Sequence, residues 1–141
     1  MSADRGPAPD VMFCLAFGGD ELSVPVMRRV LGDTLRGLGV EEDSVYDVLL
    51  AATEACTSLG ARGAGYAVVT SLSGTGCRVE VTGPGGPAYA RRRSLTVARG
   101  CVDDVTLRRR PGRNTVVILH KHISWCWDAP LRRVAAASSL S

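Results

Sequence analysis

The sequence contains few aromatic residues and no long apolar run. Aromatic side chains make up 5% of its 141 residues, and none of them alternates with arginine. Proteins that bind single-stranded nucleic acid stack bases on aromatic rings beside basic residues, so this composition argues against such a partner. No stretch reaches the roughly 18 apolar residues of a membrane-spanning helix, and the polar start MSADRGPAPD resembles no signal segment. We therefore expect a cytoplasmic protein with no direct contact to nucleic acid or membrane.

Closely spaced cysteines are also lacking. The chain has an odd number of them, and no two have the Cys-x-x-Cys spacing: they are Cys14, Cys56, Cys77, Cys101 and Cys126. This pattern argues against a disulfide framework and against a zinc site. We expect reduced thiols that pack, mostly buried, as small hydrophobic side chains.

Two histidines, His120 and His122, lie two residues apart in a predicted strand and therefore share one of its faces. Two such imidazoles are able to bind a metal ion, but the sequence offers no evident third ligand. We expect both side chains at the surface or at a sheet edge.

Charge is distributed unevenly between the two halves of the chain. Residues 1–60 hold 4 basic and 10 acidic residues, a net charge of −6, whereas residues 61–141 hold 13 basic and 4 acidic residues, a net charge of +9. Arginines cluster at 91–93 and at 108–110. Such clusters are either solvated surface or sites for a phosphate, another anion or an acidic protein partner.

Hydrophobic periodicity predicts one strand and two helices in the first half of the chain. The apolar run at 11–17 is typical of a buried strand. A helix is predicted over 26–38, with Ser23 as its N-cap and an apolar stripe of Val26, Val30, Leu31, Leu35 and Leu38. A second helix begins at the acidic residues 41–43 and ends near Gly60, with a stripe of Val45, Val48, Leu49, Ala52, Cys56 and Leu59.

The second half predicts two antiparallel hairpins. The first pairs 66–72 with 77–81, and the second pairs 104–109 with 115–123. A loop rich in glycine and proline at 82–87 and a short helix at about 94–101 connect the two hairpins. Trp125 and Trp127 follow the last strand, and we expect them to cover an edge of the core.

This order of elements predicts an α/β domain of the α+β type. The expected architecture is a two-layer sandwich in which helices cover one face of a mostly antiparallel, mixed sheet. We place this domain at residues 10–123, between a disordered N-terminus at 1–9 and a partly disordered C-terminal tail at 124–141.

Three polar residues lie on the second predicted helix opposite its apolar stripe. At 100° per residue, Asp47, Glu54 and Ser58 share one face. An ordinary solvated helix face has the same appearance, and a functional site needs a second feature that encloses this face. The glycine-rich loop after the strand at 77–81 is a candidate, because glycine allows the backbone to approach a ligand closely.

The combination of this helix and this loop resembles the GHKL ATPase superfamily, which has the Bergerat or histidine kinase-like ATPase fold. The run LAATEACTS at 50–58 is most similar to the first motif of the anti-sigma-factor serine kinases, whose helix reads Thr-Glu-Ala-x-x-Asn. The run VEVTGPGGP at 79–87 resembles the second motif, a strand that leads into Asp-x-Gly. Residues 95–104 resemble the lid and its helix, and NTVV at 114–117 resembles the closing Gly-Thr strand. The resemblance covers roughly residues 10–123.

The resemblance implies a role for each matching position. Glu54 matches the glutamate that acts as general base, and Ser58 matches the asparagine that holds the Mg²⁺ of Mg-ATP. Gly83 stands where the family has its adenine-binding aspartate, and Gly85 matches the glycine that follows. Thr115 matches the threonine of the closing strand at the nucleotide site.

Three positions depart from the family pattern. Ser58 offers a hydroxyl in place of an amide oxygen. Gly83 has no side chain to contact adenine, and a site built around a polar contact loses much of its discrimination without it. The lid segment at 90–95 contains no glycine to wrap the phosphates, which leaves Arg91, Arg92 and Arg93 as cations that bind them less specifically.

These observations lead to three hypotheses. The first is a regulator of the anti-sigma-factor kinase type with weak or lost ATP binding. It would act in transcription control by docking to a sigma factor or an anti-sigma-factor antagonist. Proteins of this type often form homodimers. The second is an active Mg-ATP-dependent serine/threonine kinase, with Glu54 as base, Ser58 as metal ligand and Arg91–Arg93 as phosphate clamp. The third is a protein that binds a different anionic ligand in the same pocket. We favour the first.

Overall fold

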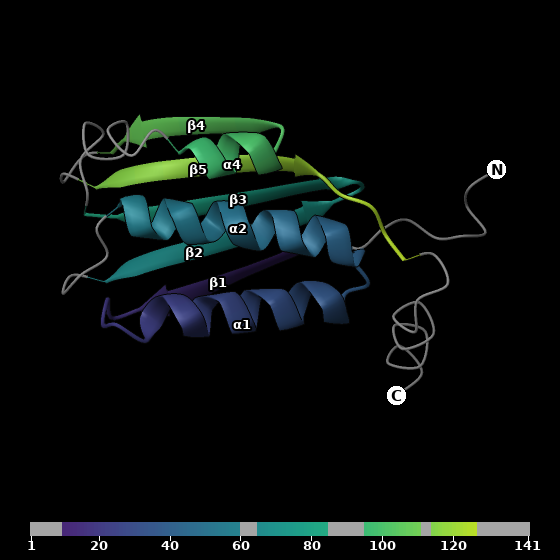
Figure 1. Cartoon of the computed structure of the whole chain (residues 1–141), viewed down its shortest axis with the longest axis horizontal. Helices are drawn as coiled ribbons and strands as arrows, with labels where there is room; N and C mark the ends of the chain where they lie inside the picture. The colour runs from purple at the N-terminus through teal and green to yellow at the C-terminus, as the bar shows by residue number, and fades with distance from the viewer. Residues whose placement is uncertain (1–9, 60–64, 85–94, 111–113, 127–141) are drawn as a thin grey trace.

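A computed structural model of the chain describes residues 10–59, 65–84, 95–110 and 114–126. In these parts of the chain, five strands form one sheet and the helices lie against one of its faces (Figure 1). The strands are β1 (Val11–Phe17), β2 (Tyr66–Ser73), β3 (Gly76–Gly83), β4 (Asp104–Arg109) and β5 (Thr115–His122), and the helices are α1 (Ser23–Gly37), α2 (Glu42–Ser58) and α4 (Thr96–Cys101). The predicted α+β sandwich is confirmed. None of the described helices has the length and apolarity that a membrane span requires.

The sheet has the strand order β1-β2-β3-β5-β4. The predicted sheet was mostly antiparallel, and each of the four described strand pairs is antiparallel. The last strand, β5, inserts between β3 and β4, so the first five residues of β5 are buried on both faces. β1 and β4 are left as the two edges of the sheet.

Helix α2 carries the centre of the core. It lies between α1 and α4 and contacts β3 and β5 behind it (Figure 1). All six residues of its predicted apolar stripe are buried: Val45, Val48, Leu49, Ala52, Cys56 and Leu59. A stripe of this width buries well because α2 has apolar neighbours on both flanks as well as beneath it.

The apolar stripe predicted for α1 is only partly correct. Leu31 and Leu35 are fully buried as predicted, together with Met27, but Val26 and Val30 are 47% and 37% exposed. The sequence of α1 is apolar on two adjacent flanks, and a period of three to four residues fits either of them. Because α1 covers the edge of the sheet beside β1, only one flank reaches the core.

The predicted N-cap of α1 is also corrected. Ser23 is the first helical residue, and its Oγ accepts a hydrogen bond from the Gly19 N–H at 3.1 Å and donates one to Asp20 Oδ1 at 3.1 Å. Asp20 Oδ1 also accepts the Leu22 N–H at 3.0 Å. Asp20 therefore organises the turn into α1, because its short carboxylate side chain reaches the amide two residues ahead and the hydroxyl three residues ahead.

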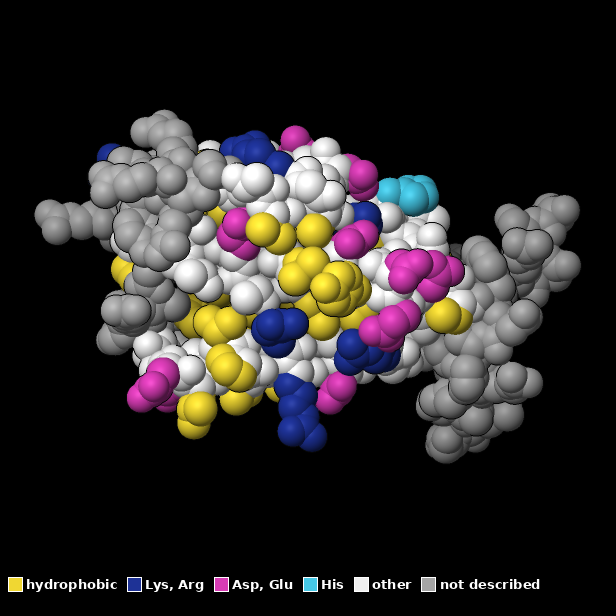
Figure 2. Space-filling model, viewed as in Figure 1, with side chains coloured by type: hydrophobic (Ala, Val, Ile, Leu, Met, Phe, Trp, Pro, Cys, Tyr) yellow, Lys and Arg dark blue, Asp and Glu magenta, His cyan; other side chains and the backbone are white. Residues whose placement is uncertain are grey.

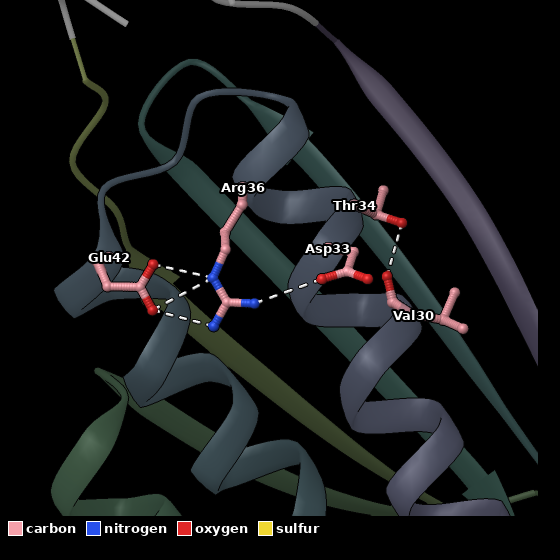
Figure 3. A network of polar contacts seen from close by, with 5 residues as sticks. All are labelled: Val30, Asp33, Thr34, Arg36 and Glu42. Atoms are coloured by element: carbon pink, nitrogen blue, oxygen red, sulfur yellow. Dashed lines mark hydrogen bonds and ion pairs between the residues drawn. The ribbon is translucent and has the colours of Figure 1, made fainter.

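An exposed ion pair joins the end of α1 to the start of α2 (Figure 3). The Arg36 guanidinium binds both carboxylate oxygens of Glu42, with N–O distances from 2.9 to 3.2 Å, and lies 3.6 Å from Asp33. Hydrogen bonding to Arg36 lowers the pKa of Glu42. The pair orients the short α1–α2 connection, but an exposed ion pair adds little to stability.

Burial of the cysteines differs from the prediction at three of the five positions. Cys56 and Cys77 are buried, and burial raises the pKa of each thiol to about 12. Cys101 and Cys126 are half-buried and Cys14 is exposed. All five are free thiols, as expected. His120 and His122 are exposed on β5, as expected.

A C-terminal strap at residues 123–126 ties the helical layer to the sheet. Trp125 is only 8% exposed, forms an isolated bridge with Val40, and donates its indole Nε1–H to the Gly74 carbonyl oxygen at 2.9 Å. The Ser124 carbonyl oxygen accepts a hydrogen bond from the Glu41 N–H at 2.8 Å. The expected position of Trp125 over an edge of the core is confirmed. The predictions for Trp127, for residues 1–9 and for the rest of the tail lie outside the described residues.

We predict that Trp125→Ala lowers the free energy of unfolding by about 3 kcal/mol, because it removes a large buried ring and the indole hydrogen bond. Trp125→Phe keeps most of the packing and should cost about 1 kcal/mol. Urea unfolding followed by circular dichroism measures both. Equal stability of Trp125→Ala and wild type would show that the strap does not hold the two layers together.

Candidate functional site

The predicted catalytic carboxylate lies between α2 and the start of α4. Glu54 is partly buried; its Oε1 accepts the Ala98 N–H at 2.7 Å, and its Oε2 lies 3.3 Å from the Val97 N–H. Leu95, the residue before α4, has a left-handed backbone with φ of 48° and provides no side-chain cap. Glu54 thus supplies from another helix the negative charge that the first turn of α4 requires.

This arrangement changes what the Glu54 carboxylate does in the fold. A general base must be within hydrogen-bond reach of the proton that it takes. Here both oxygens hold backbone amides of α4. Sequence reasoning missed this contact because the partners are 43 and 44 residues apart and the amides of α4 carry no sequence signal.

Gly83 lies where β3 comes closest to the end of α2. A Cβ atom added to Gly83 would lie 3.2 Å from the Leu59 Cβ and 3.6 Å from the Tyr66 Cβ. Both neighbours are buried core residues. A side chain at position 83 would therefore crowd Leu59 from its first carbon atom onward, and Leu59 would have to shift by a few tenths of an ångström to admit it.

Thr115 lies directly across the β3–β5 ladder from Gly83. Among the described residues, its buried Oγ1 has no hydrogen-bond partner, and neither have the buried hydroxyls of Thr70 and Tyr66. The Cys56 thiol lies close enough to the Tyr66 hydroxyl to affect the pKa of Tyr66. Burial raises the pKa of Tyr66, so its hydroxyl stays protonated. An unpartnered buried hydroxyl costs about 1–3 kcal/mol, which a water or a ligand atom would recover.

The structure brings part of the predicted site together. Gly83 and Thr115 are opposite each other. Leu59, predicted only as a core residue, and Tyr66 complete a buried cluster with them. Ser58 is the last residue of α2 and is 1% exposed. Gly85 and the three arginines Arg91, Arg92 and Arg93 lie outside the described residues.

The described residues do not fit Mg-ATP in the way that the resemblance implies. Position 83 has no carboxylate, and Leu59 lies against the point at which a side chain there would begin. Ser58 presents a buried hydroxyl where the family has a metal-binding amide. Glu54 holds α4. Among the described site positions, Thr115 alone has the residue type of the family together with a hydroxyl that has no described partner.

Comparison with known proteins supports the fold. No model of a known protein family matches the sequence, and no curated protein matches it either. The structure is similar to the crystal structure of the RsbU and RsbW domains of Rv1364c from Mycobacterium tuberculosis, with a TM-score of 0.67 and 16% sequence identity. The match covers 82% of this chain and 33% of that one, so this chain spans about a third of its neighbour's length. At this identity the likeness establishes the fold alone.

We predict that Glu54→Ala lowers the free energy of unfolding by about 2 kcal/mol, because it leaves two backbone amides of α4 without their charged acceptor. Hydrogen exchange should become faster at the Val97 and Ala98 amides while the amides of β3 stay protected. Glu54→Gln, which keeps one acceptor oxygen, should have a smaller effect. Unchanged exchange at Val97 and Ala98 in Glu54→Ala would refute the capping role.

A second prediction concerns position 83. Gly83→Ala should destabilise the fold by about 1 kcal/mol because its Cβ crowds Leu59, and Gly83→Asp should cost more because it also buries a carboxylate. Gly100→Ala is the matched control, since Gly100 lies in α4 with nothing within 4 Å of an added Cβ. The control should be neutral or slightly stabilising. Thermal unfolding of the three variants distinguishes these outcomes, and a Gly83→Asp protein as stable as wild type would contradict the packing argument.

Proposed function

We propose that this protein is a regulator of the anti-sigma-factor kinase type that acts by binding another protein, with ATP binding weak or lost. The observation that carries the proposal is that two key positions of the predicted site, 54 and 83, have structural roles in this fold. Gly83 has no carboxylate and packs closely against Leu59, and Glu54 holds the first turn of α4. When a chain keeps the fold but uses its site residues for packing, its surface is what remains to bind a partner.

The partner expected from the resemblance is a sigma factor or an anti-sigma-factor antagonist in transcription control, and a homodimer is expected as the form that binds it. The helical face offers apolar contacts for such a partner. Tyr46 on α2 and Val97 on α4 are 57% and 45% exposed, and hydrophobic side chains gather in the middle of this face (Figure 2). Exposed tyrosines surrounded by charged side chains are frequent centres of binding energy in protein interfaces.

Exposed charge on α2 and on β4 favours a defined orientation of the partner. Asp43 and Glu42 of α2 are exposed, and Arg108 and Arg109 are exposed on β4 at the far edge of the sheet. A partner that contacts both regions experiences opposite signs at its two ends, which selects one orientation and accelerates association.

We predict that binding to the cognate sigma factor or antagonist is the same with millimolar Mg-ATP, with ADP, and with a chelator of divalent ions. Calorimetric titration of the protein alone with Mg-ATP should give no heat. Tyr46→Ala should weaken partner binding about tenfold or more, a size typical of an interface centre. Glu54→Gln serves as a control that keeps α4 folded.

The opposite results identify the alternative. Micromolar Mg-ATP binding that a chelator abolishes, with phosphate transfer to a serine of the partner, would mean that the protein is an active Mg-ATP-dependent serine/threonine kinase. Partner binding that requires nucleotide would reject the nucleotide-independent regulator.

A second candidate function has its own observation in the unpartnered hydroxyls of Thr115 and Tyr66. Each of these hydroxyls would offer a hydrogen bond to a small polar or anionic ligand other than ATP. A thermal-shift screen of nucleotides, phosphate and other small anions tests this candidate, because a ligand at 100 times its Kd adds about 2.7 kcal/mol to stability. Thr115→Val should abolish any shift that such a ligand produces.

A further inference from the structure

The outer surface of α2 has an oblique row of side chains that begins apolar. Tyr46 and Leu50 are four residues apart and are therefore neighbours on the helix surface, and Glu54 continues the row by one more turn. Tyr46 is 57% exposed and Leu50 is half-buried, whereas the side of α2 that faces the sheet is buried. Rows of this spacing are inclined to the helix axis, so the row crosses α2 toward a neighbouring element.

This row meets α4 where it reaches Glu54. The backbone nitrogen of Val97 lies 3.3 Å from Glu54 Oε2, and the Val97 side chain is 45% exposed. Tyr46 and Glu54 are eight residues apart, which is a rise of about 12 Å along the helix. We call Tyr46, Leu50 and Val97 the apolar track. Its length of about two helical turns matches the i, i+4 and i+7 residues of a helix laid along it.

The end of the track at Tyr46 is acidic. We call the residues where α1 ends and α2 begins the acidic corner: Asp33, Arg36, Glu41, Glu42 and Asp43. Four carboxylates stand there against one guanidinium, a net charge of −3. Arg36 pairs with Asp33 and Glu42, which leaves Glu41 and Asp43 without an ion pair to any described residue. Figure 2 shows acidic side chains on the right of the hydrophobic group, and this surplus of negative charge attracts a basic partner.

We propose that this face binds a basic amphipathic helix of the partner, whose apolar residues contact the apolar track and whose lysines or arginines lie at the acidic corner. The proposal rests on the proposed function for the existence of a partner, and it adds the chemistry and the orientation of the segment that binds. A helix is favoured over a strand because this face consists of helices. Their backbone amides and carbonyls are paired within each helix, so the face offers no sheet edge for strand addition.

Fluorescence anisotropy with a labelled synthetic peptide tests the proposal on the full chain. The probe is a helical peptide of about 16 residues with leucine at i, i+4 and i+7 and with lysines in one terminal turn. It should bind with a Kd in the micromolar range. An identical peptide with glutamates in place of the lysines should bind at least tenfold more weakly, because the acidic corner repels it. Absence of binding by the lysine peptide, or equal binding of the two peptides, overturns the proposal.

Alanine variants of the protein test the position of the binding surface. Tyr46→Ala should weaken binding of the lysine peptide at least tenfold, and Val97→Ala about threefold or more. Leu22→Ala is the matched control, because Leu22 is an apolar side chain that is 68% exposed and lies outside the apolar track. The control should bind like wild type. Circular dichroism establishes that the three variants are folded, and a Tyr46→Ala protein that binds like the Leu22→Ala control overturns the proposal.

Charge reversal tests the orientation. Asp43→Lys should weaken binding of the lysine peptide about tenfold and strengthen binding of the glutamate peptide. Asp104→Lys, at an exposed carboxylate on the edge strand β4, should change neither. Equal effects of the two charge reversals would mean attraction by the net charge of the protein alone and would overturn the proposal. Loss of a concentration-dependent dimer in Tyr46→Ala, measured by sedimentation, would assign the track to a second copy of the chain and would also overturn it.

Failure of this proposal and failure of the proposed function give different results. Binding of a sigma factor or antagonist that is insensitive to Asp43→Lys and Val97→Ala rejects the basic helix and leaves the regulator in place. Binding of the lysine peptide to a protein that binds neither a sigma factor nor an antagonist rejects the regulator and leaves the helix-binding face in place.

Discussion

The packing of α2 against the sheet is the contact on which the other elements depend. Its stripe from Val45 to Leu59 is buried against β3 and β5, with α1 on one flank and α4 on the other. The end of this helix comes so close to β3 that a Cβ atom added to Gly83 would lie only 3.2 Å from the Leu59 Cβ. The same helix holds α4 through Glu54 and reaches β5 through an ion pair of 3.0 Å between Asp47 and Lys121, whose ammonium also donates to the Cys101 carbonyl at the end of α4. One helix therefore positions the whole helical layer.

This use of α2 supports the proposal that the protein acts by binding a partner. In the family that the sequence resembles, the polar face of this helix supplies the general base and the metal ligand. Here its polar groups join elements of the fold to one another: Asp47 binds Lys121, and Glu54 binds α4. Charged groups that are satisfied within the protein are poor candidates for chemistry, because any step would have to break the contacts that hold them. The fold and its surface remain available for a partner.

The described surface differs from one side of the molecule to the other. The helical face has the exposed Tyr46 and Val97 among acidic side chains, which is where we place a regulatory partner. The edge strand β4 carries Asp104, Arg108 and Arg109, which keep it solvated.

The sequence by itself determined the elements and the fold class. The bounds of β1 agree with the prediction to the residue, the α2 stripe is buried as predicted, and both hairpins form. Local periodicity and turn residues carry this information, because the period of an element is visible in its own residues.

Tertiary structure alone decided which flank of α1 is buried, since Met27 and Val26 fit a helical period equally well. It also decided that Glu54 caps α4 and that Leu59 fills the space beside Gly83. These contacts join residues 24 to 44 positions apart, and such pairs meet only after the layers have packed.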